Sequence, residues 1–396
     1  MTKPEENKTK TSNLIIEKIK SIWVIIGITI FLIIIIEGIA SLIANFVFVD
    51  PVTRKYNEQE EIFKNSDYYK NLKKEEMASL KVRWDPYDYW KRVPFKGKYV
   101  NISFEGIRKT WNPVIKNTKA RPLTIFIFGG STMWGTGSRD DYTIPSDVAK
   151  ILSENTNIDF QVINLGEYGY VSAQELISLI RELQKGIVPD IVVFYDGIND
   201  TYTAYQNCTA GLSHNEFNRV KDFNLHQDKN RLAENYLNVA IKTSGIYRVM
   251  STLKKTEQIK DPACENVDML VDSTIYNYLT NIGLVEHIGK LYGFKTLFYW
   301  QPSIFCKKEL SKYEQKQLAK EKYLQDFHDK VYNKIKSLAM LNSKANFTNL
   351  SDIFYNSKEE LFIDYSHITE NGNKAIAEKI AEDVLKIIKE KDNKGK

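Results

Sequence analysis

Short apolar runs alternate with stretches of helical periodicity beyond residue 120, and this alternation limits the possible folds more than any other feature. Strands separated by helices pair in parallel, with helices covering both faces of the sheet. Helical patterns occur near residues 145–155 and 172–185, and a closing helix begins near Thr369. The strand-like runs are LTIFIF, FQVINL, DIVVFY, FKTLFYW and ANFTNL. The sequence therefore predicts an α/β fold, a three-layer, doubly wound parallel sheet.

Composition fits a folded protein with a large core. The chain has 396 residues, of which 43% are hydrophobic and 12% aromatic. This length holds one large domain or two ordinary ones. The net charge of +5 is small for the length, and lysines and acids are interspersed along the helices. We therefore expect solvated helix faces and no nucleic-acid partner.

An apolar stretch near the N-terminus predicts a membrane helix over residues 22–49. It runs from Trp23 to Val49 and exceeds the roughly 20 residues that cross a bilayer. Lysines such as Lys18 and Lys20 precede it, so residues 1–21 are expected in the cytoplasm and the remainder in the periplasm or outside the cell. A cleaved signal peptide is the alternative, but its apolar core is usually about 7–15 residues.

Glu37 interrupts the apolar stretch. An ionisable group within a bilayer is costly, so Glu37 could mark a contact with a partner helix. The other interpretation is that Glu37 is protonated or lies near the boundary of the bilayer.

Residues 50–120 are expected to form a stem followed by a segment packed on the main domain. KNSDYYKNLKKEE is typical of an exposed helix, and the sequence from Trp84 to Trp111 predicts short strands and turns. A free linker would not carry so many aromatic residues, so packing is favoured over a role as a wall beside a substrate.

A serine, a histidine and an aspartate are placed where nucleophilic chemistry would need them. Ser131 directly follows the first strand run, and Asp364 and His367 stand three residues apart in DYSH. A serine hydroxyl becomes a nucleophile when an imidazole takes its proton, and a carboxylate fixes the imidazole tautomer. The pattern predicts Ser131 as nucleophile, His367 as base and Asp364 as the acid that orients it.

Two further blocks supply candidate donors for a developing oxyanion. Gly169 lies in NLGEYGY and Asn199 in YDGIND, each after its own strand run. The backbone amides of Ser131 and Gly169 and the side-chain amide of Asn199 would provide three hydrogen-bond donors. Ligands of such folds bind at the carboxyl ends of the strands, where these residues are expected.

In this order the blocks resemble those of the SGNH hydrolases, also called the GDSL-like lipase and esterase superfamily. The resemblance spans roughly residues 122–390 and implies an SGNH, flavodoxin-like domain over 121–391. It assigns the same roles to Ser131, His367, Asp364, Gly169 and Asn199. One position departs from the family pattern, because Gly130 stands where aspartate is common. The four blocks are Gly129-Gly130-Ser131-Thr132, Asn164-Leu165-Gly166-Glu167-Tyr168-Gly169, Gly197-Ile198-Asn199-Asp200 and Asp364-Tyr365-Ser366-His367.

Each block alone has an ordinary structural explanation. Glycine, serine and threonine after a strand are typical of a turn and a helix N-cap, and Gly-Ile-Asn-Asp is typical of a loop. Asp364 and His367 would then belong to a surface loop ahead of a helix capped by Thr369. Only the ordered set of four blocks favours a catalytic site.

An insertion over residues 201–272 is expected to form a lid or wall over the site. It contains the helix-like stretch RLAENYLNVAIKTSGIYRVMSTLKK, and Lys307 to Ala339 predicts another long, charged helix. Of three cysteines, Cys208 and Cys264 could form a disulfide across the insertion, and Cys306 would stay free. Connectivity does not follow from sequence, and free thiols are the alternative.

No cofactor or metal is expected. The cysteines form no CxxC pair, and the other histidines form no ligand pattern and are expected at the surface or in packing: His214, His226, His287 and His328. GGSTMWGTG lacks the lysine of a phosphate-binding loop, and no GxGxxG with a downstream acid is present.

The resemblance implies a serine esterase that acts through an acyl-enzyme on O-acyl, above all O-acetyl, groups of envelope glycans or on other esters. Acyl transfer to a sugar hydroxyl would use the same residues. A catalytically silent glycan-binding or assembly protein is the alternative from another class.

Overall fold

The computed structural model describes residues 5–46, 68–117, 119–225, 229–253 and 264–394. The chain divides into two compact units. The smaller unit comprises Met1–Lys55 and Val220–Lys260, and the larger comprises Tyr56–Arg219 and Asp261–Lys396. The domain boundaries drawn from the sequence stay predictions, and the insertion 201–272 is shared between the two units.

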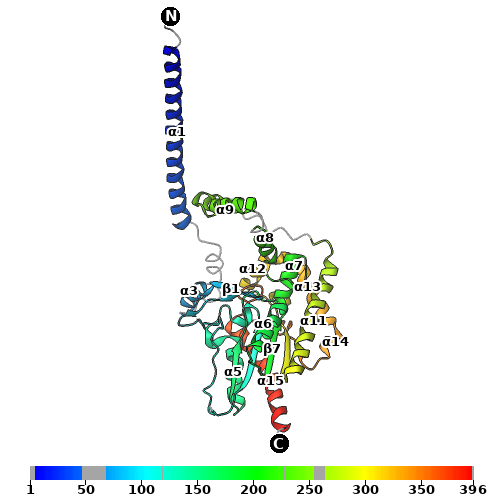
Figure 1. The fold of residues 1–396 in the computed structure, drawn as a ribbon. Helices are drawn as coiled ribbons and strands as arrows, with labels where there is room; N and C mark the ends of the chain where they lie inside the picture. Colours follow the sequence, from blue (N-terminus) through cyan, green and yellow to red (C-terminus); the bar gives the residue numbers. More distant parts are fainter. Residues whose placement is uncertain (1–4, 47–67, 118, 226–228, 254–263, 395–396) are drawn as a thin grey trace. The chain divides into compact units, whose positions relative to one another are not determined.

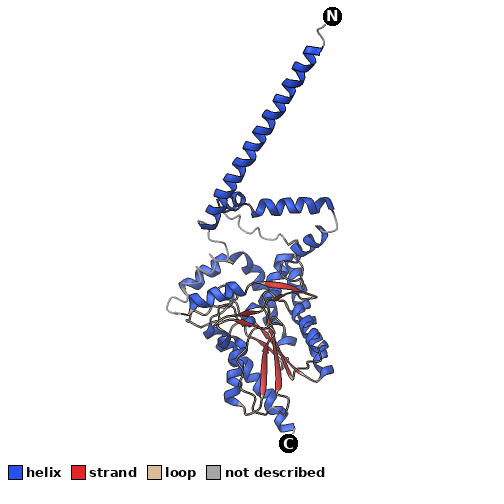
Figure 2. Ribbon diagram, turned by 60° about the vertical axis from the view of Figure 1, so that its left-hand side comes forward, coloured by secondary structure: helices blue, strands red, loops and turns tan. Residues whose placement is uncertain are grey.

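A five-stranded parallel sheet forms the centre of the larger unit (Figure 2). The strand order is β6-β5-β7-β8-β9, so the first strand of the sheet in sequence lies second in space. All neighbouring strands are parallel. This is the order of a doubly wound, flavodoxin-like sheet, and the predicted fold class is confirmed. The strands are β5 (Leu123–Gly129), β6 (Phe160–Asn164), β7 (Ile191–Asp196), β8 (Lys295–Trp300) and β9 (Phe347–Asn349).

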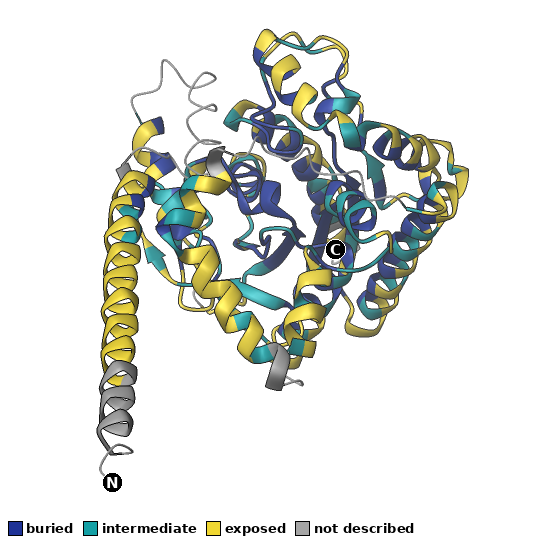
Figure 3. Cartoon of the chain, turned by 90° about the horizontal axis from the view of Figure 1, so that it is seen from above, coloured by how far each residue is buried: buried dark blue, intermediate teal, exposed yellow. Residues whose placement is uncertain are grey.

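Alternating side chains of each strand build two cores, one on each face of the sheet. In β5, Ile125 and Ile127 face one core, while Phe126 and Phe128 face the other. Because both faces are covered, the strands are apolar throughout, which explains their continuous apolar runs. Figure 3 shows the strands, and the sides of the helices that face them, as buried. The first core is covered by α5 (Ile144–Asn155) and α15 (Glu370–Lys394), and the second by α6 (Ser172–Gln184), α11 (Val267–Tyr292) and α13 (Gln325–Ser337).

The stretch from Lys307 to Ala339 is not one long helix, so that prediction is wrong. It consists of α12 (Lys312–Lys320), a 3₁₀ turn at Lys322–Leu324 and α13. Leu324 is fully buried at the break, so core packing there overrides the helical propensity of the surrounding charged residues. The chain also contains α7 (Ile198–Asn207), α8 (Glu216–Leu225), α14 (Ala339–Asn342) and 3₁₀ turns at Asp140–Tyr142 and Ile304–Cys306.

The segment before β5 packs on the sheet. It contains α3 (Tyr69–Ser79) and two short hairpins, β1 (Val82–Asp85) with β2 (Tyr89–Arg92) and β3 (Phe95–Lys96) with β4 (Asn101–Ile102). A backbone bridge pairs Arg108 with Asn164 at the end of the edge strand β6. Residues 47–67, where the expected stem lies, are outside the described residues.

The smaller unit contains three described helices, α1, α9 and α10, and the part of α8 that follows Arg219. The first, α1 (Glu5–Phe46), includes the apolar span Ile16–Asn45, which is long enough to cross a membrane and has none of its most apolar window buried (Figure 3). The helix-like part of the insertion forms α9 (Lys229–Thr243), labelled in Figure 1, and α10 (Gly245–Leu253), and Ser244 joins them. The Ser244 hydroxyl accepts the Tyr247 N–H at 3.1 Å and caps α10. A lid formed by this part of the insertion stays a prediction.

Candidate active site

Three of the four sequence blocks lie at the carboxyl ends of neighbouring strands. Ser131 begins α4 (Ser131–Trp134) directly after β5, Gly169 follows β6, and Asn199 lies in the first turn of α7 after β7. Because parallel strands end at one edge of the sheet, the blocks are brought together although they are separated in sequence.

Ser131, His367 and Asp364 form a continuous hydrogen-bond chain. Ser131 Oγ lies 2.7 Å from His367 Nε2, and His367 Nδ1 lies 2.8 Å from both carboxylate oxygens of Asp364. These distances are within the range of a nucleophile and base pair. A neutral imidazole whose Nδ1–H donates to Asp364 leaves Nε2 free to accept the serine proton. All three residues are buried, and Ser131 is 8% exposed, so this set of hydrogen bonds is shielded from bulk water.

A tight loop fixes the histidine and the aspartate. The N–H of Ile363 donates to the His367 carbonyl at 2.8 Å, and the N–H of Thr369 donates to the Leu361 carbonyl at 2.8 Å. Asp364 Oδ1 also accepts the N–H groups of Ser366 at 3.1 Å and His367 at 2.9 Å. The spacing of three residues therefore lets one carboxylate cap the turn and orient the imidazole.

The candidate oxyanion donors lie beside one another. Asn199 Nδ2 donates to the carbonyl of Tyr170 at 2.7 Å, which links it to the residue after Gly169. The same Nδ2 atom lies only 2.1 Å from where a Cβ on Gly130 would be, next to Ser131. Gly169 has a φ of 70°, a conformation that favours glycine. Asn199 thus lies between the residue that follows Gly169 and the residue that precedes Ser131.

Glycine is required at position 130 because the Asn199 amide occupies the space of a side chain there. Gly130 has an ordinary φ of −77°, so a Gly130→Ala change adds no backbone strain. Its methyl group would push aside the end of the flexible Asn199 side chain. On the sequence-based assignment of Asn199 as an oxyanion donor for ester hydrolysis, we expect stability to change little and kcat to fall about 10²–10³-fold.

The control for this prediction is Gly283→Ala, because a Cβ at Gly283 meets nothing within 4 Å. Asn199→Ala should cost a similar factor, and the double variant should be no worse than either single variant. A Gly130→Ala enzyme with full activity would show that Asn199 is not a donor.

A second serine–histidine pair, which the sequence did not reveal, lies beside the last block, because the N–H of Ile304 donates to the Tyr365 carbonyl at 3.0 Å. Ser303 Oγ is 2.7 Å from His328 Nε2, and His328 Nδ1 is 3.1 Å from Asp329. Both Ser303 and His328 are fully buried, and His328 stacks on Tyr332 at 3.8 Å between ring centroids. Burial lowers the pKa of His328. Because both side chains are fully buried, we interpret this pair as a packing arrangement, and it provides a matched control for Ser131.

Two buried arginines support the site, and no motif identified them. Arg92 pairs with Glu167 at 3.1 Å, and Arg108 pairs with Asp140 at 3.1 Å, with each arginine side chain no more than 2% exposed. Both guanidinium groups lie over the ring of Trp134, at 5.1 and 4.2 Å. Removing one partner from such a pair typically costs about 3–5 kcal/mol. The segment before β5 therefore holds α4 and the glycine block in place.

A third buried carboxylate, Glu76 of α3, lies beside these arginines. Its Oε1 accepts the N–H of Gly137 at 2.5 Å, just after α4. Burial raises the pKa of Glu76 to about 7, although the charges of Arg108, His367 and Arg92 and the Gly137 N–H oppose this. Glu76 therefore gains or loses its proton near neutral pH.

The raised pKa of Glu76 makes stability depend on pH. A folded pKa above the unfolded value stabilises the fold fully below about pH 4.5, and this contribution is lost as pH rises through about 7. At roughly 1.4 kcal/mol per pKa unit, the loss approaches about 3 kcal/mol. Thermal unfolding in detergent from pH 4.5 to 8 should therefore show the wild type losing stability relative to Glu76→Gln. A difference that is constant across this range would contradict the assignment.

Three more buried carboxylates, Glu175, Asp196 and Asp200, lie under the start of α7. Asp200 accepts the Ser172 hydroxyl at 2.6 Å, and burial raises its pKa to about 6. Burial and mutual repulsion raise the pKa of Glu175 well above its usual value, and burial and the Asp200 charge do the same for Asp196. Burial therefore disfavours the charged forms of all three carboxylates.

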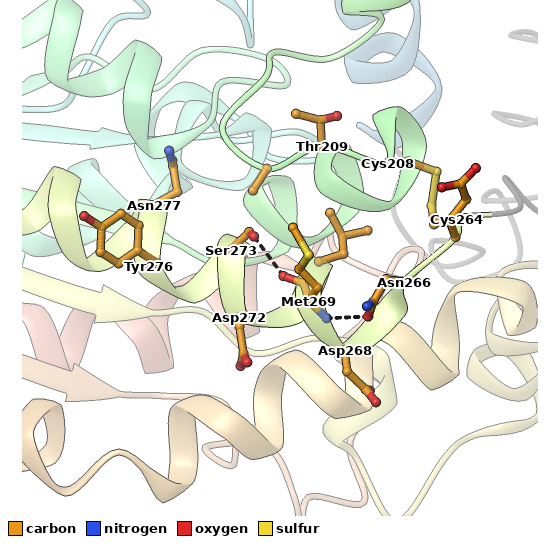
Figure 4. Close-up of a pocket in the computed structure, with 13 residues that line it drawn as sticks. Cys208, Thr209, Cys264, Asn266, Asp268, Met269, Asp272, Ser273, Tyr276 and Asn277 are labelled. Atoms are coloured by element: carbon orange, nitrogen blue, oxygen red, sulfur yellow. Dashed lines mark hydrogen bonds between the residues drawn. A yellow bond between two sulfur atoms is a disulfide. The ribbon is translucent and has the colours of Figure 1, made fainter.

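The predicted disulfide between Cys208 and Cys264 is present, and Cys306 is free. A cavity of about 1180 Å³ lies beside the disulfide and the first turns of α11, where Asn266 accepts the Met269 N–H (Figure 4). None of the four blocks lines this cavity. Within the described residues no cluster of His, Cys, Asp and Glu is placed to hold a metal. His214 stacks on Tyr202, His287 is exposed, and His226 lies outside the described residues.

No protein-family model matches the chain, and no curated protein matches it. Among solved structures the chain is similar to an acetyl xylan esterase (12% identity, TM-score 0.34, covering 65% of this chain and 97% of the other). It is also similar to a carbohydrate acetylesterase family member from Sinorhizobium meliloti (15% identity, TM-score 0.33, covering 66% of this chain and 96% of the other). A third similar structure is that of a putative lipolytic protein of the G-D-S-L family from Desulfitobacterium hafniense (7% identity, TM-score 0.35, covering 66% of this chain and 99% of the other).

Proposed function

We propose that the chain is a serine ester hydrolase of the SGNH type. The observation that carries this proposal is the 2.7 Å contact between Ser131 Oγ and His367 Nε2, continued to Asp364, at the carboxyl edge of a parallel sheet. The proposal extends to an acyl-enzyme on Ser131. Acetyl esters of envelope glycans are the favoured substrates, because the proposed anchor would place the site at the cell envelope.

The mechanism uses only residues of this chain. Ser131 Oγ attacks the ester carbonyl carbon as its proton moves to His367 Nε2, and Asp364 stabilises the imidazolium. The N–H groups of Ser131 and Gly169 and the Asn199 amide donate to the resulting oxyanion. The carbon–oxygen bond to the alcohol then breaks, and His367 returns the proton to the departing alcohol. Water repeats the cycle on the acyl-enzyme and releases the acid.

Fluorophosphonate labelling of the full chain in detergent tests the nucleophile. The probe is expected to label the wild type, and Ser131→Ala and His367→Ala are expected to lose the label, since the reaction needs a serine activated by its base. Ser303→Ala is the matched control and should label like the wild type, because Ser303 has the same 2.7 Å contact to a histidine but is fully buried. If the folded wild type is not labelled, a glycan-binding protein is favoured. If only Ser303→Ala loses the label, the nucleophile is Ser303 and not Ser131.

We also propose that α1 is an uncleaved membrane anchor, with the N-terminus in the cytoplasm and the larger unit in the periplasm or outside the cell. The apolar span Ile16–Asn45 and the lysines before its most apolar part support this orientation. Reporter enzymes fused after residue 60 test it, and activity of a reporter that works only in the cytoplasm would overturn it.

A further inference from the structure

The hairpin α9–α10 contacts the proposed membrane anchor within the smaller unit. The carboxylate of Glu37 accepts the backbone N–H of Gly245 and, at 3.2 Å, that of Ile246. The Ser41 hydroxyl donates to the same carboxylate at 3.1 Å. Glu37 thus satisfies two of the N–H groups that the first turn of α10 leaves unpaired, at the positive end of the helix dipole. One turn further on, Arg248 donates to Asn45 at 3.0 Å.

Glycine permits this close approach. A Cβ on Gly245 would lie 2.3 Å from the Ser41 backbone nitrogen and 2.6 Å from its Cα, atoms that cannot move aside within a helix. By contrast, a Cβ on Gly38, in the same part of α1, would meet nothing within 4 Å. Any side chain at position 245 would therefore separate the two helices.

The contact lies near the outer boundary of the hydrocarbon if Lys20 marks the inner one. At about 1.5 Å per residue, Glu37 lies roughly 25 Å along α1 from Lys20. The hydrocarbon of a bilayer is about 30 Å thick. A carboxylate at this depth needs polar partners, and the start of α10 provides them. The structure therefore supports the predicted contact of Glu37 with a partner helix, and the position of Glu37 along α1 agrees with the alternative that it lies near the boundary.

The hairpin presents an exposed apolar surface at this level. Figures 1 and 2 show α9 lying across the direction of α1. Between α1 and the hairpin lies an open, largely apolar groove of about 670 Å³. A helix with one apolar face that lies across a membrane span is typical of an interfacial helix. Large exposed apolar side chains of the hairpin are Tyr236 (68%), Leu237 (62%), Val239 (50%), Ile241 (48%), Tyr247 (41%) and Met250 (57%).

From these contacts we infer that α9–α10 is a lipid-binding hairpin, docked on the anchor through Glu37 and Gly245. It lies in the outer boundary layer of the bilayer with its apolar face toward the acyl chains. The inference rests on the proposed anchoring of α1. It adds a second membrane contact to the chain, made by a segment that the Cys208–Cys264 disulfide closes into a loop.

Depth measurements on the full chain in phosphatidylcholine vesicles test the lipid contact. A nitrobenzoxadiazole label is attached to single cysteines in a Cys306→Ser background with the disulfide intact. A label at Tyr236→Cys should be quenched several-fold by lipids with brominated acyl chains. The matched control is Asn238→Cys, which is two residues away, on nearly the opposite face of α9, and should stay in water.

A label at Leu32→Cys, within α1, separates failure of the hairpin from failure of the anchor. If Leu32 is quenched while labels at 236 and 238 behave alike, the hairpin inference is wrong and the anchor stands. If neither Leu32 nor Tyr236 is quenched, the anchor is wrong as well, and the hairpin inference falls with it.

Limited trypsin digestion of the same vesicles tests the docking. Cleavage between Cys208 and Cys264 leaves the fragments joined until the disulfide is reduced, so only reduction-dependent bands report on this loop. Gly245→Leu should increase these bands several-fold, and Gly38→Leu should leave them at the wild-type level. Equal cleavage in the wild type and Gly245→Leu would overturn the docking.

Discussion

Ser131→Ala and His367→Ala are each expected to lower kcat for ester hydrolysis on the order of 10⁶-fold, and the double variant to be no slower than either. A serine without its base and a base without its serine are both inert, so each single change removes the whole covalent route. The 2.7 Å contact between the two side chains makes them such a unit. A p-nitrophenyl acetate assay with the full chain in detergent measures the three rates.

A serine and a histidine outside the proposed triad, Ser303 and His287, provide the controls. Ser303→Ala removes a buried serine hydroxyl that also contacts a histidine, and His287→Ala removes an exposed imidazole. Both should keep wild-type kcat. Single-variant losses that multiply in the double variant would mean that Ser131 and His367 act independently, which would contradict the acyl-enzyme route.

The strands and the four blocks were predictable because each depends on local sequence. A strand buried on both faces must be apolar along its length, so β5 and β7 appear as continuous runs. The turn that bears Asp364 and His367 is also local, since one carboxylate serves both the backbone and the imidazole within three residues. Such features need no knowledge of distant partners.

The supporting contacts were not predictable because their partners are distant in sequence. Arg92 meets Glu167 and Arg108 meets Asp140, and nothing in the local sequence of either arginine marks it as buried. Gly130 is similar, since its need for glycine appears only once the Asn199 amide is in place. The break between α12 and α13 has no glycine or proline to announce it, because burial of Leu324 causes it.

Asp364→Asn is expected to lower kcat about 10⁴-fold while the fold is kept. Asp364 Oδ1 accepts two backbone N–H groups, so an asparagine would keep its carbonyl oxygen there and turn its amide toward His367 Nδ1. The imidazole would then carry its proton on Nε2, the tautomer that cannot accept the serine proton. The p-nitrophenyl acetate assay measures the loss, and the thermal unfolding midpoint reports on the fold.

Asp159→Asn is the control for turn capping, because Asp159 accepts the Lys116 N–H on Oδ1 at 2.9 Å and the Asn117 N–H on Oδ2 at 2.7 Å, in a surface turn without a histidine. Because these two N–H groups use both oxygens, an asparagine loses one of them, so Asp159→Asn should cost at least as much stability as Asp364→Asn and leave kcat unaltered. The comparison separates the two roles of Asp364, because capping the turn is common to both aspartates and orienting the imidazole belongs to Asp364. If both variants keep full activity, Asp364 serves only the turn, and His367 must be oriented by packing against neighbours such as Tyr168, whose ring lies 5.9 Å away.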